Sequence, residues 1–123
     1  MIRPDWVTNE QHWLDDCAAV VKICKSYLSG DLGLIETSRE LVGYAHRLRE
    51  INNPDFTFFI AIDSESDHLP VGKWQEGWAA DSLIKKDREV KEIGAFYSHN
   101  AYAAAQSLIN KFDSAEPDAA ANP

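Results

Sequence analysis

The sequence has few of the features that mark secreted, membrane-bound or nucleotide-binding proteins. Its 123 residues contain no apolar run close to the ~20 residues that a membrane span needs. The first residues, MIRPDWVTNEQHW, lack the apolar centre of a signal peptide. There is no glycine-rich phosphate loop and no Gly-x-Ser-x-Gly nucleophile motif. We therefore expect a cytoplasmic protein with no membrane segment.

Cysteine is also scarce, with only Cys17 and Cys24 present. On a helix, residues seven apart share a face but lie about 10 Å apart along the axis, which is too far for a disulfide. A pair of cysteines that binds a metal or acts in redox chemistry usually has closer spacing or nearby histidines. We expect two buried, reduced thiols.

Positive charge is in short supply. The sequence contains twenty acidic and twelve basic residues, which gives a formal charge of −8. Such a field repels nucleic-acid phosphates and anionic lipid, so we expect neither partner, and it attracts a basic protein. The alternative is that acidity simply keeps the protein soluble. The basic residues at 85–91 are most simply the solvated face of a helix.

Apolar periodicity predicts a first helix from about residue 9 to 28. Its stripe recurs at three- and four-residue steps: Trp13, Cys17, Val20, Val21, Cys24, Tyr27 and Leu28. Thr8 and Gln11 have the spacing of a capping box at its start. Gly30 suits the left-handed residue that follows a helix end.

Further helices are predicted over about 34–50, from residue 80 or 81 to about 97, and over 101–112. Pro54 ends the first of these, because the residue before proline avoids helical geometry. Ser98-His99-Asn100 is a predicted break or bend. We expect an all-α, single-domain bundle of four to five helices over residues 1–112. The tail, 113–123, has nothing to bury and is predicted to be disordered.

The central apolar segment, 54–65, supports two interpretations. Phe56, Phe58, Ile60 and Ile62 alternate as in a strand. Against this, Asn53 is a good N-cap, and Pro54 suits the first helical position. No second convincing strand exists to pair with it, and a lone strand leaves its backbone unsatisfied. We predict a buried helix and keep a strand as the alternative.

Polar residues gather directly after this segment: Asp63, Glu65, Asp67 and His68. They could hold a transition metal or act as an acid–base pair. A calcium loop is a poor match, because the glycine and glutamate that it needs are replaced by His68 and Trp74. Acids at the end of a buried helix also commonly pair with arginines, and the predicted helix over 34–50 offers Arg39, Arg47 and Arg49. The structural interpretation is the stronger one.

Two stretches resemble a family of small bacterial proteins found in polymorphic-toxin and contact-dependent inhibition gene clusters. They are Leu34-Ile35-Glu36-Thr37-Ser38-Arg39-Glu40-Leu41 and Ala61-Ile62-Asp63-Ser64-Glu65-Ser66-Asp67-His68-Leu69-Pro70-Val71-Gly72. The second stretch is the specific part. The resemblance implies an immunity-type role, in which the protein binds a toxin domain and blocks it. It also makes six residues signature positions: Glu36, Arg39, Asp63, Glu65, Asp67 and His68.

The expected function is therefore stoichiometric neutralisation of a basic toxin domain, a nuclease among the candidates, without catalytic residues, metal or cofactor. Six residues are candidate partner contacts: Asp15, Asp16, Glu40, Glu50, Trp74 and Trp78. Tryptophan is enriched at binding hot spots, but it also closes over core edges. Two alternatives stay open. One is a metal-dependent hydrolase built on Asp63, Glu65, Asp67 and His68. The other is a regulatory or scaffold module that homodimerises, so both a monomer and a homodimer are retained.

Overall fold

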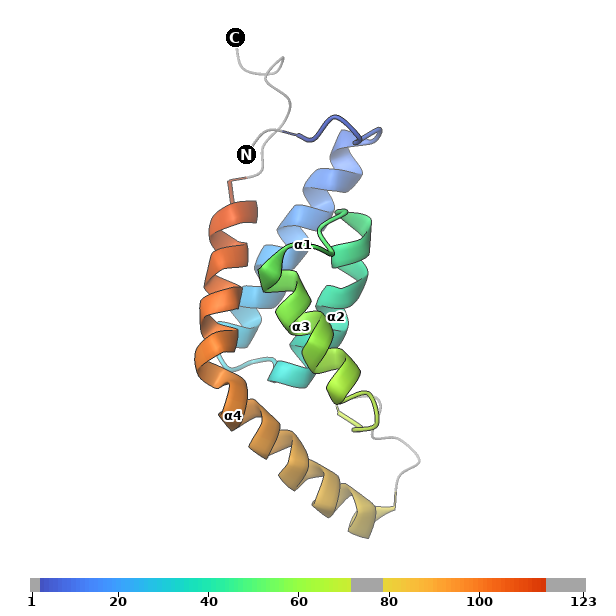
Figure 1. Ribbon diagram of the computed structural model, residues 1–123, viewed down its shortest axis with the longest axis vertical. Coiled ribbons are helices and arrows are strands. Elements are labelled where there is room, and N and C mark those ends of the chain that lie inside the picture. The colour runs from blue at the N-terminus through green and yellow to red at the C-terminus, as the bar shows by residue number, and fades with distance from the viewer. Residues whose placement is uncertain (1–2, 72–78, 115–123) are drawn as a thin grey trace.

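The computed structural model describes residues 3–71 and 79–114, apart from the side chain of residue 81. These residues form four α-helices and no strand (Figure 1). The helices are α1 (Glu10–Leu28), α2 (Leu34–Arg47), α3 (Pro54–Glu65) and α4 (Ala80–Phe112). The all-α prediction is confirmed. Trp74 and Trp78, and most of the tail that was predicted to be disordered, lie outside the described residues.

Helix α1 is capped by Asn9, so the predicted capping box of Thr8 and Gln11 is wrong. Asn9 has extended backbone dihedrals, and its side-chain oxygen accepts the backbone N–H of His12 at 3.0 Å. Asparagine is at least as good an N-cap as threonine, which explains the shift of one residue. At the other end, Gly30 has a φ of 87°, as predicted for the left-handed residue after the helix.

Helix α2 ends at Arg47, three residues before the predicted end at about residue 50. Arg49 takes the left-handed conformation, with φ 53°, and the N–H of Glu50 bonds the carbonyl of Ala45 at 2.9 Å. This closing motif usually uses glycine. The Arg49 guanidinium lies 4.8 Å from the centre of the Trp6 ring, a cation–π contact that holds the N-terminal segment against this turn.

The central apolar segment forms helix α3, Pro54–Glu65, so the strand alternative is wrong. The side chain of Asn53 accepts the backbone N–H of Asp55 at 2.9 Å, and Pro54 occupies the first turn. Phe56, Phe59 and Ile62 are buried, whereas Phe58 and Ile60 are half-buried. That spacing of three residues is the inward stripe of a helix.

Helix α4 is continuous through residues 98–100, where a break or bend was predicted. Figure 1 shows it bending along its length, so that its first half extends past the α1–α3 bundle. The Ser98 hydroxyl donates to the carbonyl of Ala95 at 3.1 Å, and such side-chain bonds to the backbone often accompany helix bends. Helix α4 packs against α1, and the second half of α4 buries three small residues, Ala101, Ala104 and Ala105.

All four helices contribute to one hydrophobic core, which holds Trp13, Leu41, Phe59 and Leu108 among others. A smaller cluster consists of Ile35, Leu69 and Val71, with Val90 and Ile93 of α4 packed on it. It seats the segment after α3, and the first half of α4, on α2. Within the described ranges, no helix is both long and apolar enough to cross a membrane.

Both cysteines lie in the main core and are fully buried. Burial raises the pKa of each thiol from 9.0 to about 12. The negative charges of Asp16 and Glu50 raise the pKa of Cys17 further, and the charge of Asp55 does the same for Cys24. The thiolate is the reactive form. We expect neither thiol to react with an aromatic disulfide reagent at pH 8 in the native protein, and both to react in denaturant.

The raised pKa values of the two thiols also predict how the stability of the fold changes with pH. The unfolded thiols ionise above pH 9.0, while the folded ones stay protonated to about pH 12. The free energy of unfolding should therefore fall as the pH rises through this window. Rapid modification of either thiol in the native state would contradict the burial described here.

Candidate functional site

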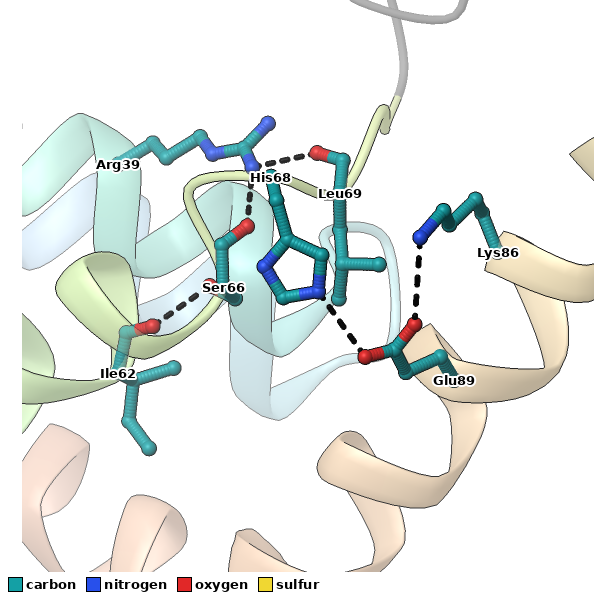
Figure 2. A network of polar contacts seen from close by, with 7 residues as sticks. All are labelled: Arg39, Ile62, Ser66, His68, Leu69, Lys86 and Glu89. Carbon is teal, nitrogen blue, oxygen red and sulfur yellow. Dashed lines mark hydrogen bonds and ion pairs between the residues drawn. The ribbon is translucent and has the colours of Figure 1, made fainter.

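The polar cluster predicted around residues 63–68 is organised by Arg39 of α2. Its Nη2 atom donates to the backbone carbonyls of Ser66 at 2.7 Å and Leu69 at 2.5 Å (Figure 2). The Arg39 side chain is 11% exposed. Hydrogen bonds to a charged donor are stronger than neutral ones, so this contact ties the turn after α3 firmly to α2.

Two further contacts shape this turn. The Ser66 hydroxyl, itself buried, donates to the carbonyl of Ile62 one helical turn earlier (Figure 2). The Nε of Arg39 lies 3.8 Å from a carboxylate oxygen of Asp63, which is 31% exposed. The Arg39–Asp63 contact is therefore the looser part of the arrangement, and the carbonyl contacts are the tighter part.

The turn is also joined to the first half of α4. His68 Nε2 lies 2.9 Å from a carboxylate oxygen of Glu89, and Lys86 Nζ lies 3.8 Å from the other oxygen (Figure 2). At the end of α3, Glu65 accepts a hydrogen bond from the Tyr97 hydroxyl at 3.0 Å. These contacts are exposed, so each adds little stability, but together they fix where α4 meets the turn.

The His68 contact gives Glu89 a testable titration. The hydrogen bond from His68 is the largest cause of a pKa for Glu89 below its ordinary 4.5, and Lys86 acts in the same direction. A carboxyl shifted this way stabilises the fold above pH 4.5 and loses that contribution as the pH falls. We expect a carbon-detected NMR titration of Glu89 to show a midpoint below 4.5. His68→Ala should raise the midpoint more than Lys86→Ala, and an unchanged midpoint in His68→Ala would contradict the contact.

The four residues of the hydrolase alternative do not converge on one point. Asp63 faces Arg39, Glu65 faces Tyr97, and His68 faces Glu89, while Asp67 is exposed. Over residues 3–71 and 79–114, no group of three or more histidine, cysteine, aspartate or glutamate side chains is placed to hold a metal ion. The positions of Asp63, Glu65 and His68 fit roles in holding the turn.

The acids predicted to contact a partner differ in their surroundings. Asp16 and Glu50 each form an ion pair. The Oδ1 atom of Asp16 lies 3.4 Å from Nε of Arg47, and the Oε1 atom of Glu50 lies 2.7 Å from Nζ of Lys111. Asp15 is exposed and accepts a hydrogen bond from the Gln11 side chain at 2.8 Å. Glu40 is exposed and makes no polar contact with a described residue. The other two predicted contacts, Trp74 and Trp78, lie outside the described residues.

Comparisons of the chain with protein-family models, with curated proteins and with solved structures find no match.

Four acidic residues lie on the elements that Arg39 joins, and we call them the acidic face: Glu36 and Glu40 on α2, Asp63 on α3, and Asp67 on the turn after α3. Glu36 and Glu40 flank Arg39 along α2, and Asp67 lies on the turn that Arg39 holds. Residues 50–71 contain five carboxylates and no lysine or arginine. Arg39 lies 3.8 Å from Asp63, whereas Glu40 and Asp67 are exposed and have no ion pair with a described residue.

Sequence reasoning placed Arg39 and Asp63 in one cluster but missed the residues that complete it. The carbonyls of Ser66 and Leu69 carry no sequence signal, since every residue has a carbonyl. Glu89 and Tyr97 lie more than twenty residues further along the chain. Only the path of α4 past the turn brings them to His68 and Glu65.

Proposed function

We propose that this protein is an immunity-type inhibitor that binds a basic toxin domain in a one-to-one complex through the acidic face. The observation that carries the proposal is the exposure of two of its carboxylates, Glu40 and Asp67. Glu40 and Asp67 are exposed and make no polar contact with a described residue, and Arg39, which precedes Glu40 in the chain, donates to two backbone carbonyls. Their negative potential is therefore available to a partner rather than neutralised within the chain.

The physics of such a complex fits a toxin that acts on nucleic acid. A nuclease needs a positive surface to attract phosphates, and a chain of charge −8 presents the complementary potential. Charge complementarity acts mainly on the association rate and on the choice of partner. A standard interface covers about 800 Å² on each partner, which a domain of this size can supply.

The proposal also draws on the resemblance of residues 34–41 and 61–72 to proteins of toxin gene clusters. In this structure the two stretches meet, because Arg39 of the first holds the turn in the second. We infer that the signature residues Arg39 and Asp63 build the platform, and that Glu40 and Asp67 on it contact the partner. Asp16 and Glu50 form ion pairs with Arg47 and Lys111 of the same chain, so they are weaker candidates for partner contacts.

The test is a charge reversal on the acidic face with a matched control. Glu40→Lys/Asp67→Lys should slow association with the toxin domain encoded beside this protein by about 10- to 100-fold at low salt. The control, Asp5→Lys/Asp113→Lys, makes the same change of charge at two exposed positions. These lie in the segment before α1 and at the end of α4, away from the turn after α3 (Figure 1).

The measurements are association kinetics and inhibition of the toxin at equimolar protein. We expect the control pair to slow association less than the acidic-face pair, because its charges lie farther from the proposed interface and Coulomb interactions weaken with distance. An equal loss in both variants would point to net charge alone. A toxin left fully active by equimolar natural protein would refute the immunity function.

A further inference from the structure

The first half of α4 carries a face that no other described element covers. A shallow hollow of about 560 Å³ on this face is lined entirely by residues of α4: Ile84, Asp87, Arg88, Lys91, Glu92 and Ala95. Ile84 is 64% exposed, and Phe96 at the far end of the same stretch is 80% exposed. Figure 1 shows this half of the helix extending beyond the bundle, where a second molecule can reach it.

The residues of this face follow a regular row. Ile84, Arg88, Glu92 and Phe96 are each four residues apart, so they form one of the ridges by which helices most often pack. The inward residues Val90 and Ile93 lie on the other side of the helix, against the smaller cluster. The row therefore points away from the molecule's own core. We call the four residues Ile84, Arg88, Glu92 and Phe96 the α4 ridge.

The order of residues in the α4 ridge is self-complementary when reversed. If two copies cross antiparallel about residue 90, Ile84 of one lies beside Phe96 of the other, at both ends. Arg88 of one then lies beside Glu92 of the other, again twice. Neither Arg88 nor Glu92 has an ion pair with a described residue of its own chain, so both charges are available.

The same charges disfavour other pairings. In the antiparallel arrangement, a shift of one helical turn in either direction sets Arg88 against Arg88, or Glu92 against Glu92. A parallel arrangement in register sets both of these like pairs side by side. Like charges held together select against a register as effectively as opposite charges select for one.

We propose that the α4 ridge is a homodimerisation surface, on which a second copy of this chain packs antiparallel with Arg88 opposite Glu92. The ridge spans about 18 Å of helix, which is short for a protein interface. The dimer should therefore be reversible, with a dissociation constant of about 10–100 µM. None of the four residues of the α4 ridge belongs to the acidic face.

The first test is sedimentation velocity of the full chain over a dilution series. The natural protein should pass from dimer to monomer, and Ile84→Asp should raise the dissociation constant at least about tenfold. Lys22→Glu, at an exposed position on α1, is the control and should leave it unchanged. Circular dichroism of each variant confirms that the helices are intact. A natural protein that stays monomeric at ~1 mM would overturn the proposal.

The decisive test is rescue in trans. Arg88→Glu alone sets the introduced glutamate against Glu92 of the partner copy, and Glu92→Arg alone sets the introduced arginine against Arg88 of the partner copy. Each like-charge pair occurs twice in the dimer, so each variant should be monomeric. Mixed one to one, the two variants restore both pairs of opposite charge and should form a heterodimer.

The control for this rescue is a mixture of Lys22→Glu with Asp15→Arg, two exposed positions on α1. That mixture should show no association beyond that of the natural protein, because neither position lies on the α4 ridge. Dimerisation of the single Arg88→Glu or Glu92→Arg variant, or a mixture of the two that stays monomeric, would refute the register.

Discussion

Arg39→Ala is expected to lower the free energy of unfolding by about 3–5 kcal/mol, because it removes a mostly buried cation together with its hydrogen bonds to two backbone carbonyls. The carbonyls of Ser66 and Leu69 would lose the charged donor that Arg39 supplies. The Arg39 side chain is only 11% exposed, so water reaches these carbonyls poorly. The turn after α3 would lose its anchor on α2. The measurement is chemical denaturation of the natural protein and the variant at pH 7.

Two controls separate this role from a simple loss of charge. Asp63→Asn removes the longer contact, at 3.8 Å, and should cost only about 1 kcal/mol or less. Arg47→Ala removes a cation whose side chain is 54% exposed and should also cost about 1 kcal/mol or less. Equal costs for Arg39→Ala and Asp63→Asn would mean that the ion pair, and not the carbonyl contacts, holds the turn.

Phe59→Ala is the second substitution with a large expected effect, at about 3–5 kcal/mol of unfolding free energy. Phe59 is fully buried in the main core, and its removal would leave a cavity that the neighbouring helices fill only in part. Phe58, its neighbour, is half-buried. Phe58→Ala should therefore cost distinctly less, and thermal or chemical denaturation would measure both.

The comparison also tests the conformation of the central segment. A strand over residues 56–62 would bury Phe58 together with Phe56 and turn Phe59 outward. The helix buries Phe56 and Phe59. A larger cost for Phe58→Ala than for Phe59→Ala would contradict the helix.

Most of the fold could be predicted from local signals. Asn53 and Pro54 mark the start of α3, and the glycine at position 30 marks the end of α1. These residues act through their own backbone preferences, which are visible in the sequence. The end of α2 was placed late because Arg49 takes a left-handed conformation that usually signals glycine. Contacts such as that with Trp6 support this conformation, and they depend on the folded chain.

The site was harder to predict than the fold. The spacing of acids and histidine at 63–68 drew attention to the right segment, and Arg39 was among the arginines considered as a partner. Its principal contacts, however, are backbone carbonyls, and the partners of Glu65 and His68 come from α4. Long-range placement of this kind depends on how the helices cross, which residue patterns specify weakly.

The surface charges illustrate the same limit. Glu40, Glu50 and Asp16 have equal standing in the sequence as exposed acids. The structure distinguishes them, because Asp16 and Glu50 lie beside Arg47 and Lys111, while Glu40 does not contact a described cation. The distance in the chain between each acid and its partner is too great for helical spacing to reveal the pairs.

The measurement that most directly tests the proposed function is affinity capture of partners from the native host, followed by titration. Tagged natural protein and the Glu40→Lys/Asp67→Lys variant serve as baits at low and moderate salt, with bound proteins identified by mass spectrometry. We predict that the natural bait retains a basic toxin domain at one to one, that the variant retains less of it, and that equimolar natural protein abolishes its toxic activity. A captured toxin domain that stays fully active at equimolar protein, or equal capture by both baits, would contradict the account.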